Sequence, residues 1–550
     1  MQMQPETMRT ESLGRLYRPV GWCVAVLGAV PLALLCFMAA RHSAAFDHEG
    51  FQETMTVVPV NTVRVLLTAA VLGAAAAGIG WLSARGKRGE TILTAVSSVT
   101  VTLLGCMWSL SVHGHPVDDQ LRVWEMATAL ANDTIDGINI DYLIMFPYQS
   151  GMALFLEPLA RLFGPDPYPA FGIFNALCAG GCVWALCAIC GLLWPTGGAR
   201  GICAVLCLVF TPLSVMSGFL YGTLAAAVMG LWAMYGVLRL CRGGSALWWL
   251  LTLLLPLAVV CYNGAMLFAA AAFCLLAADG LLGGGKKKLL TRLLPAVVLL
   301  IVCLNAASWA GEFFTWRTGI QLGDGIPKSA WVVMGLTAEN TNSGPGGYNS
   351  YTKLLFWKNN ADSAATNAAA MQDLRSYLAS WRVTPHQNFG FLHEKIQTEW
   401  LDPWFDALTG SYHPEVDVPG DFASLLCGGS LLEPMEQFLR AVLVLIYGTA
   451  GFGTLALAMR RNGSVWAQGM TVCFLGSFLF QIVWENHSRY CFPYFLCLIP
   501  IAAAGLAQAG ELPGKCCLHL CRNKTAPLKK EPGPENARQE NPEQASLRKA

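Results

Sequence analysis

Adjacent carboxylates open the most polar stretch in the first third of the chain. Asp118 and Asp119 follow an apolar run, and an apolar pattern of helical period continues from them through Leu130. A carboxylate at the start of a helix is commonly a cap for free backbone amides. One aspartate can serve as that cap, but a second beside it is not needed and repels the first. Hydrocarbon does not accept carboxylates, so this pair must face water, a substrate or a metal ion.

Two histidines precede the aspartates. His113 and His115 with Asp118 and Asp119 combine imidazole and carboxylate groups, which are ordinary ligands for divalent ions. The four residues therefore predict a candidate site for a divalent metal ion such as Mg²⁺ or Mn²⁺. They lack the fixed helical spacing of a metal motif, so the sequence leaves metal dependence open.

A second polar cluster, at 484–490, reads Trp-Glu-Asn-His-Ser-Arg-Tyr. Glu485 and Arg489 are four residues apart and can pair across one helical turn. The alternative is that Arg489 binds a phosphate group, for which a planar guanidinium is well shaped. Tyr490 is either a supporting residue of such a site or one of the aromatic residues usual at a membrane interface.

Three more residues are supporting candidates. Tyr221 stands at the outer end of an apolar run, Asp141 lies in the acidic stretch after Asp119, and Lys328 is a cation in a large polar insert. Each also has an ordinary interpretation, because turns and exposed surfaces commonly carry these residue types.

These residues must be positioned by membrane helices. Of 550 residues, 54% are hydrophobic and 13% are charged, whereas a soluble domain carries roughly a quarter charged residues. Runs of ~20 apolar residues match the hydrocarbon thickness. We therefore predict an all-α polytopic membrane protein, and the net charge of +1 gives no indication of a nucleic-acid partner. About twelve spans are predicted, at 21–40, 62–84, 91–112, 169–194, 201–218, 222–238, 246–262, 264–281, 289–308, 437–459, 466–484 and 490–508.

Basic residues set the predicted orientation. With both termini in the cytoplasm, every predicted inner loop carries Lys or Arg, as cytoplasmic loops of a cell-membrane protein should. The apolar segment 147–163 tests this orientation. Counting it as a span would move every later loop to the opposite side of the membrane and place Lys286–Lys288 outside. We therefore predict an interfacial or re-entrant helix there.

The predicted organisation has five parts. They are the N-terminal spans (1–90), a membrane core (91–308) with an acidic outer loop at 113–168, an extracytoplasmic insert (309–436), the C-terminal spans (437–508), and a cytoplasmic, largely disordered tail (509–550). Within the insert, 362–382 and 391–401 are expected to be helical.

Motifs in these parts resemble the GT-C superfamily of membrane glycosyltransferases, in particular bacterial proteins similar to family 39 and the protein O-mannosyltransferases. The resemblance covers roughly residues 91–505. It is carried by Asp118-Asp119 directly after a span, by 142–151 (YLIMFPYQSG) leading into 159–164 (LARLFG), by 325–336 (GIPKSAWVVMGL), and by Glu485…Arg489-Tyr490.

The resemblance implies a GT-C-like fold and transfer of a sugar from a polyprenyl-phosphate donor, at the outer leaflet, with inversion. It implies Asp119 as the catalytic acid residue that acts as general base or positions a metal, and Asp118 as its helper. The acceptor would be a glycan, lipid or protein of the cell envelope. Two predicted spans more than usual precede the aspartates, and Asp141 is the weakest assignment, because no second acidic motif can be matched.

Two other classes of function remain open at this stage. Twelve spans also suit a transporter or flippase of a lipid-linked glycan, although transporters tend to carry ionisable residues near the midplane, and here the span interiors are nearly free of them. A non-catalytic subunit of cell-envelope polymer assembly, with the insert as a binding surface, is the other alternative. Replacing Asp118 and Asp119 separates these classes, because a scaffold should tolerate the change.

Overall fold

The computed structural model describes residues 17–46, 55–86, 88–164, 166–282, 286–337, 344–460 and 465–524. Residues 1–508 form one compact unit and 509–550 form a second. The predicted tail begins within the last helix, α25 (Leu498–Lys524), and 525–550 lie outside the described residues.

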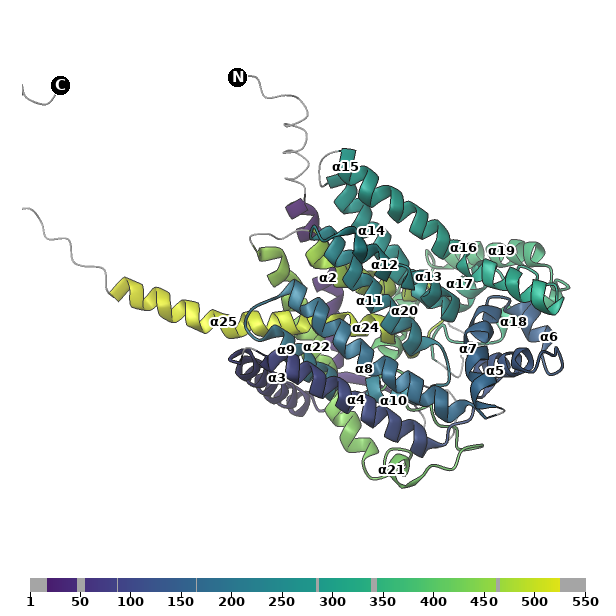
Figure 1. Cartoon of the computed structure of the whole chain (residues 1–550), viewed down its shortest axis with the longest axis horizontal. Coiled ribbons are helices and arrows are strands. Elements are labelled where there is room, and N and C mark those ends of the chain that lie inside the picture. The colour runs from purple at the N-terminus through teal and green to yellow at the C-terminus, as the bar shows by residue number, and fades with distance from the viewer. Residues whose placement is uncertain are drawn as a thin grey trace, which may run out of the picture. The chain divides into compact units, whose positions relative to one another are not determined.

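Helices make up almost all of the described secondary structure (Figure 1). Within the described residues the sheet is limited to an antiparallel pair, β1 (His42–Phe46) and β2 (Met55–Pro59), with His42 opposite Pro59. The described secondary structure therefore confirms the prediction of an all-α polytopic chain.

Nine helical segments in the described part of the chain are long and apolar enough to cross a membrane. They are α2 (Tyr17–Ala39), α3 (Thr62–Ala84), α4 (Gly89–Val112), α8 (Tyr168–Leu193), α11 (Thr223–Cys241), η3 with α14 (Asn263–Ala265 and Met266–Leu282), η4 with α16 (Leu289–Leu293 and Leu294–Thr318, preceded by α15, Lys286–Lys288), α22 (Leu432–Met459), and η5 with α23 (Val465–Gln468 and Gly469–Val483).

Two further spans are bent. One joins α9 (Ala199–Val209) to α10 (Pro212–Val215) and η1 (Met216–Gly218) at 62°, and the other joins α24 (Ser488–Leu496) to α25 at 47°. Pro212 at the first position of α10 explains the first bend, since proline cannot continue a helix from the preceding turn. Counting each bent pair as one span gives eleven.

The predicted count of twelve differs from the structure at one segment. Residues 246–262 form η2 (Ala246–Trp248), α12 (Trp249–Thr252) and α13 (Leu254–Cys261), which together are shorter than a span. Pro256 lies in the first turn of α13, where proline is tolerated, whereas a longer helix would place it in the interior.

The acidic loop folds into three helices. These are α5 (Asp118–Ala131), α6 (Ile140–Met145) and α7 (Gln149–Phe163), with α7 packed on α5 (Figure 1). Arg161 on α7 binds Glu157 at 2.8 Å and Asp133 at 2.5 Å, and Arg317 at the end of α16 also binds both carboxylates. With 15 residues, α7 is too short to span a membrane of ~30 Å.

The insert supplies five more helices: α17 (Lys328–Leu336), α18 (Tyr351–Lys358), α19 (Ser363–Ser380), α20 (Pro385–Trp400) and α21 (Asp421–Ser424). The first expected helix corresponds to α19, whose start Asp362 caps. The second corresponds to α20, which begins earlier because Pro385 suits a first turn. α20 packs against α24, α23 and β1, so the insert is joined to the membrane helices.

Candidate functional site

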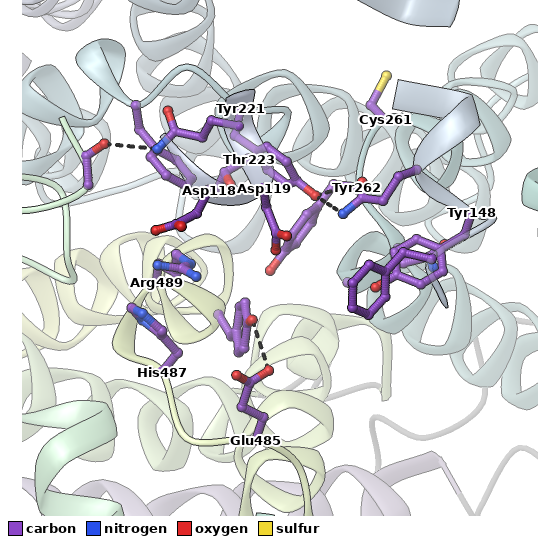
Figure 2. Close-up of a pocket in the computed structure, with 18 of the residues that line it drawn as sticks. Asp118, Asp119, Tyr148, Tyr221, Thr223, Cys261, Tyr262, Glu485, His487 and Arg489 are labelled. Carbon is purple, nitrogen blue, oxygen red and sulfur yellow. Dashed lines mark hydrogen bonds between the residues drawn. The ribbon is translucent and has the colours of Figure 1, made fainter. Parts of the chain in front are cut away.

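A cavity of about 1530 Å³ lies where the acidic loop, the insert and the ends of several membrane helices meet. Most of the candidate residues from the sequence line it: Asp118, Asp119, Tyr221, Lys328, Glu485, Arg489 and Tyr490. Figure 2 shows the two aspartates and Arg489 projecting from opposite sides into the same space.

The aspartates are the first two residues of α5. The cap position itself belongs to Val117, which makes no side-chain cap hydrogen bond, so neither aspartate is the N-cap residue. Asp118 has a φ of +46°, in the left-handed region that aspartate tolerates better than most residues. This turn directs both side chains into the cavity, close to the positive end of the helix dipole.

Asp119 has the electrostatics of a base. Its side chain is accessible from the cavity but is otherwise surrounded by protein, and this enclosure raises its pKa above the ordinary value. Tyr142, Arg489 and Lys353 lower the pKa by a smaller amount, and Asp118 raises it. A raised pKa makes the ionised carboxylate a stronger proton acceptor than an exposed aspartate.

Arg489 is held by a turn in the insert that the sequence did not reveal as functional. Its guanidinium donates to the Asp406 carboxylate at 2.8 Å, and the His487 ring lies 3.6 Å from the same oxygen. Phe405 and Asp406 both have positive φ, at +50° and +60°. The sequence suggested that Arg489 either pairs with Glu485 or binds a phosphate group. The structure shows an ion pair of Arg489 with Asp406.

Asp402 anchors this turn. Its carboxylate accepts hydrogen bonds from the Asp406 amide at 2.7 Å, the Trp404 amide at 2.9 Å and the Ser488 hydroxyl at 2.7 Å. Burial raises the pKa of Asp402 to about 6 despite these bonds. The available signal was an Asp-Pro-Trp-Phe-Asp run directly after α20, which places two acids in an otherwise apolar segment.

Glu485 is buried at the cavity wall and accepts a hydrogen bond from the Tyr490 hydroxyl at 3.2 Å (dashed in Figure 2). Burial raises its pKa to about 7, while His487, Arg489 and the Tyr490 bond oppose the shift. Glu485 therefore changes charge near neutral pH, unlike an exposed glutamate. Tyr221 lies elsewhere on the wall, where its hydroxyl donates to Gln149 at 2.7 Å.

A buried lysine fixes the backbone that carries Glu485. Lys395 on α20 has no exposed surface, and its ammonium donates to the carbonyls of Gly335 and Trp484, each at 2.5 Å. These carbonyls lie at the ends of α17 and α23, where a cation is favoured. Glu399, one turn further along α20, is buried, and burial raises its pKa to about 8.

We expect Gly335→Ala to disturb this junction. A Cβ at residue 335 would lie 2.3 Å from the Trp484 carbonyl oxygen, which Lys395 also holds, so the backbone must move. The expected loss of stability is about 1–3 kcal/mol, measured by thermal unfolding in lipid nanodiscs. The matched control is Gly390→Ala on α20, where a Cβ meets nothing within 4 Å and helix propensity favours Ala by up to ~1 kcal/mol. Equal stabilities for the two variants would contradict the tight junction.

Three candidate residues lie away from the cavity. The His115 ring is 3.0 Å from the Asp417 carboxylate, and the His113 ring is 3.0 Å from the Val418 carbonyl, so both face the segment after α20. Asp141 is exposed in the first turn of α6, where it complements the helix dipole.

The four predicted metal ligands are therefore not gathered in one place. Within the described ranges, no three His, Cys, Asp or Glu side chains lie close enough together to hold a metal ion. Of these four residues, only Asp118 and Asp119 line the cavity, and a divalent ion such as Mg²⁺ or Mn²⁺ stays a candidate cofactor.

Part of the cavity lining is apolar. It includes Val260 on α13, Leu267 on α14, and Cys303, Leu304 and Ala307 on α16, beside the polar Ser308 and Glu312 of the same helix. Leu304 is 59% exposed and belongs to a row of exposed apolar side chains along α16. The cavity thus connects a charged region at Asp119 and Arg489 with an apolar wall on a membrane helix.

Comparison with known proteins shows a similarity to a solved structure. No protein-family model and no curated protein matches the sequence. The chain is similar to the crystal structure of the Archaeoglobus fulgidus oligosaccharyltransferase in the apo form, with a TM-score of 0.41 and 11% sequence identity. The match covers 81% of this chain and 53% of the archaeal chain, so this chain spans about half the length of that protein.

Proposed function

We propose that this protein is a GT-C-like membrane glycosyltransferase. It transfers a sugar from a polyprenyl-phosphate donor to an acceptor hydroxyl, carried by a glycan, lipid or protein of the cell envelope, on the extracytoplasmic side of the cell membrane. The observation that carries this proposal is a cavity lined both by Asp119 and Arg489 and by apolar side chains of α16.

Asp119 is the proposed general base. The acceptor hydroxyl attacks the anomeric carbon as its proton passes to the Asp119 carboxylate, and the bond between that carbon and the phosphate oxygen breaks. The new glycosidic bond forms on the face opposite the leaving phosphate, so the anomeric configuration inverts. Asp118 supports this step by keeping a second negative charge beside the base, which favours proton uptake.

Arg489 is the proposed partner of the leaving phosphate. The phosphate keeps the electron pair of the broken bond, and a guanidinium facing it stabilises the developing charge. The bond to Asp406 orients Arg489 from the other side. The prenyl chain lies along Leu304 and Ala307 of α16, whose apolar side chains line the same cavity.

The donor experiment uses the full-length protein in lipid nanodiscs and a panel of radiolabelled polyprenyl-phosphate sugars, with and without EDTA. We expect one donor to be consumed with release of polyprenyl phosphate, and Asp141→Asn to be as active as wild type because Asp141 is exposed outside the cavity. The EDTA samples test whether a divalent metal ion takes part. Binding of a donor without turnover would favour the flippase alternative, and binding of none would favour the non-catalytic subunit.

The rate of transfer should depend on pH through Asp119. A base acts only when it is ionised, so kcat/KM should fall as the pH is lowered through the raised pKa of Asp119. This fall should occur at a higher pH than it would for an ordinary aspartate, whose pKa is about 3.9. Burial raises the pKa of Glu485 to about 7, so the profile should be repeated with Glu485→Gln. An acidic limb that persists unchanged in Asp119→Asn would contradict the assignment.

A further inference from the structure

The first turns of the α16 span carry an apolar groove on their outer surface. The groove has a volume of about 510 Å³ and is lined by Leu289, Leu290, Leu293, Leu294 and Val297. Leu290 is 64% exposed and Leu294 is 53% exposed. This segment is also the least buried of the nine membrane-spanning segments described above, so the groove opens away from the helix bundle, toward the membrane.

A change of helix type accounts for the groove. Residues Leu289–Leu293 (η4) form a π-helical turn, in which hydrogen bonds join residues five apart, and α16 continues from Leu294 as an α-helix. A π turn holds more residues than an α turn and is therefore wider, which spreads the leucines apart along this one helix. The Thr291 hydroxyl donates to the Lys287 carbonyl at 2.8 Å, so this carbonyl before the turn is satisfied. Single π turns inside α-helices are frequent at functional sites.

Ion pairs hold this turn against the neighbouring helices. Asp279 on α14 is buried, and its carboxylate accepts a hydrogen bond from the Tyr17 hydroxyl of α2 at 2.8 Å. The same carboxylate lies 3.1 Å from the Lys288 ammonium and 3.5 Å from Nε of Arg292. Arg292 also donates to the Leu240 carbonyl of α11 at 3.1 Å. The groove is therefore preformed, because the turn that shapes it is tied to three other helices.

Positive charge gathers in the turn before the groove. Lys288 keeps 43% of its side chain exposed despite its pair with Asp279. Lys287 is exposed and forms no ion pair with any residue that the structure describes. Three cations, Lys287, Lys288 and Arg292, stand beside one carboxylate here, so this corner keeps an excess of positive charge. It therefore offers a site for an anionic group at the edge of an apolar groove.

We propose that this corner binds an anionic phospholipid. Its phosphate contacts Lys287 and Lys288, and one acyl chain lies in the groove over Leu290 and Leu294. From Lys287 to Val297 the helix rises by about 15 Å, which is half of a hydrocarbon layer of ~30 Å, so the site fits within one leaflet. An apolar helix of a second protein would also cover the groove, but it would leave Lys287 without an anion. Such a lipid site does not depend on the proposed sugar transfer.

Native mass spectrometry of the delipidated full-length protein tests the headgroup contact. Phosphatidylglycerol and phosphatidylcholine with identical acyl chains are titrated separately. We expect phosphatidylglycerol to bind more tightly, and Lys287→Gln to weaken its binding by about five-fold, because one cation near the membrane surface is lost. Lys287→Arg keeps the charge and should bind as wild type. The matched control is Arg88→Gln, which removes an exposed cation before α4, outside the groove, and should not change the binding.

The acyl-chain contact is tested separately. Leu290→Trp fills the groove and should weaken phosphatidylglycerol binding, whereas the control Leu103→Trp, at an exposed leucine on α4, should not. Soluble glycerol phosphate should not displace the lipid, because it has no chain to occupy the groove. Equal affinities for the two phospholipids, or equal losses in Lys287→Gln and Arg88→Gln, would overturn the site. Displacement by glycerol phosphate, or a dimer that binds no phospholipid and dissociates in Leu290→Trp, would contradict an acyl chain in the groove.

Discussion

Replacement of Asp119 by Asn should lower the rate of sugar transfer by about 10³-fold, within the range that a positioned general base supplies. The amide has nearly the shape of the carboxylate but cannot take the acceptor proton. Because the surroundings of Asp119 raise its pKa and so favour its neutral form, the neutral amide should not destabilise the fold. Single-turnover kinetics with a saturating donor would measure the change, and donor binding should stay within about two-fold of wild type.

Asp118→Asn is the matched variant for this prediction. Asp118 opens the same helix and lines the same cavity, but it is the helper, so we expect a loss of only about ten-fold. A larger loss for Asp118→Asn than for Asp119→Asn would indicate that Asp118 is the general base and Asp119 its helper. Wild-type rates for both variants would contradict general-base catalysis by either aspartate.

Arg489→Ala should lower the transfer rate by about 10²–10³-fold, the range found when one donor to a developing anion is removed. It should also weaken the binding of sugar-free polyprenyl phosphate. Arg489→Lys keeps the charge but loses the planar fork, so an intermediate loss is expected. Rates and phosphate affinities should be measured in the same nanodisc preparation.

A stability control is needed for Arg489, because its removal leaves the buried Asp406 carboxylate without this partner. The double variant Arg489→Ala/Asp406→Asn removes both charges and should recover thermal stability without recovering transfer. Recovery of transfer together with stability would show that Arg489 has a structural role only, which would contradict its assignment to the phosphate.

The sequence predicted the convergence of Asp119 and Arg489 through topology. Both stand at the ends of spans that the distribution of basic residues assigned to the outer side, and both line one cavity in the structure. Asp406 could not be found in this way. Its position depends on the left-handed backbone at Phe405 and Asp406 and on the bonds to Asp402, which no periodic pattern records.

Proximity in sequence was misleading for the histidines. His113 and His115 are close to Asp118 along the chain, but the left-handed turn at His113 and the bond from His115 to Asp417 direct them to another segment. The hydropathy pattern predicted the positions of the apolar segments but not the places where their helices bend or end. The bend before α10 and the shortness of the segment ending in α13 depend on local proline geometry and on packing between helices.

Photo-crosslinking tests the central claim, that a polyprenyl phosphate binds in the cavity between Arg489 and α16. A polyprenyl phosphate with a diazirine on its first prenyl units would be activated in nanodiscs, and labelled peptides would be identified by mass spectrometry. The account predicts labelling around 303–307 of α16, competed by unlabelled polyprenyl phosphate and reduced in Arg489→Ala. Labelling confined to other surfaces, or labelling that is independent of Arg489, would contradict it.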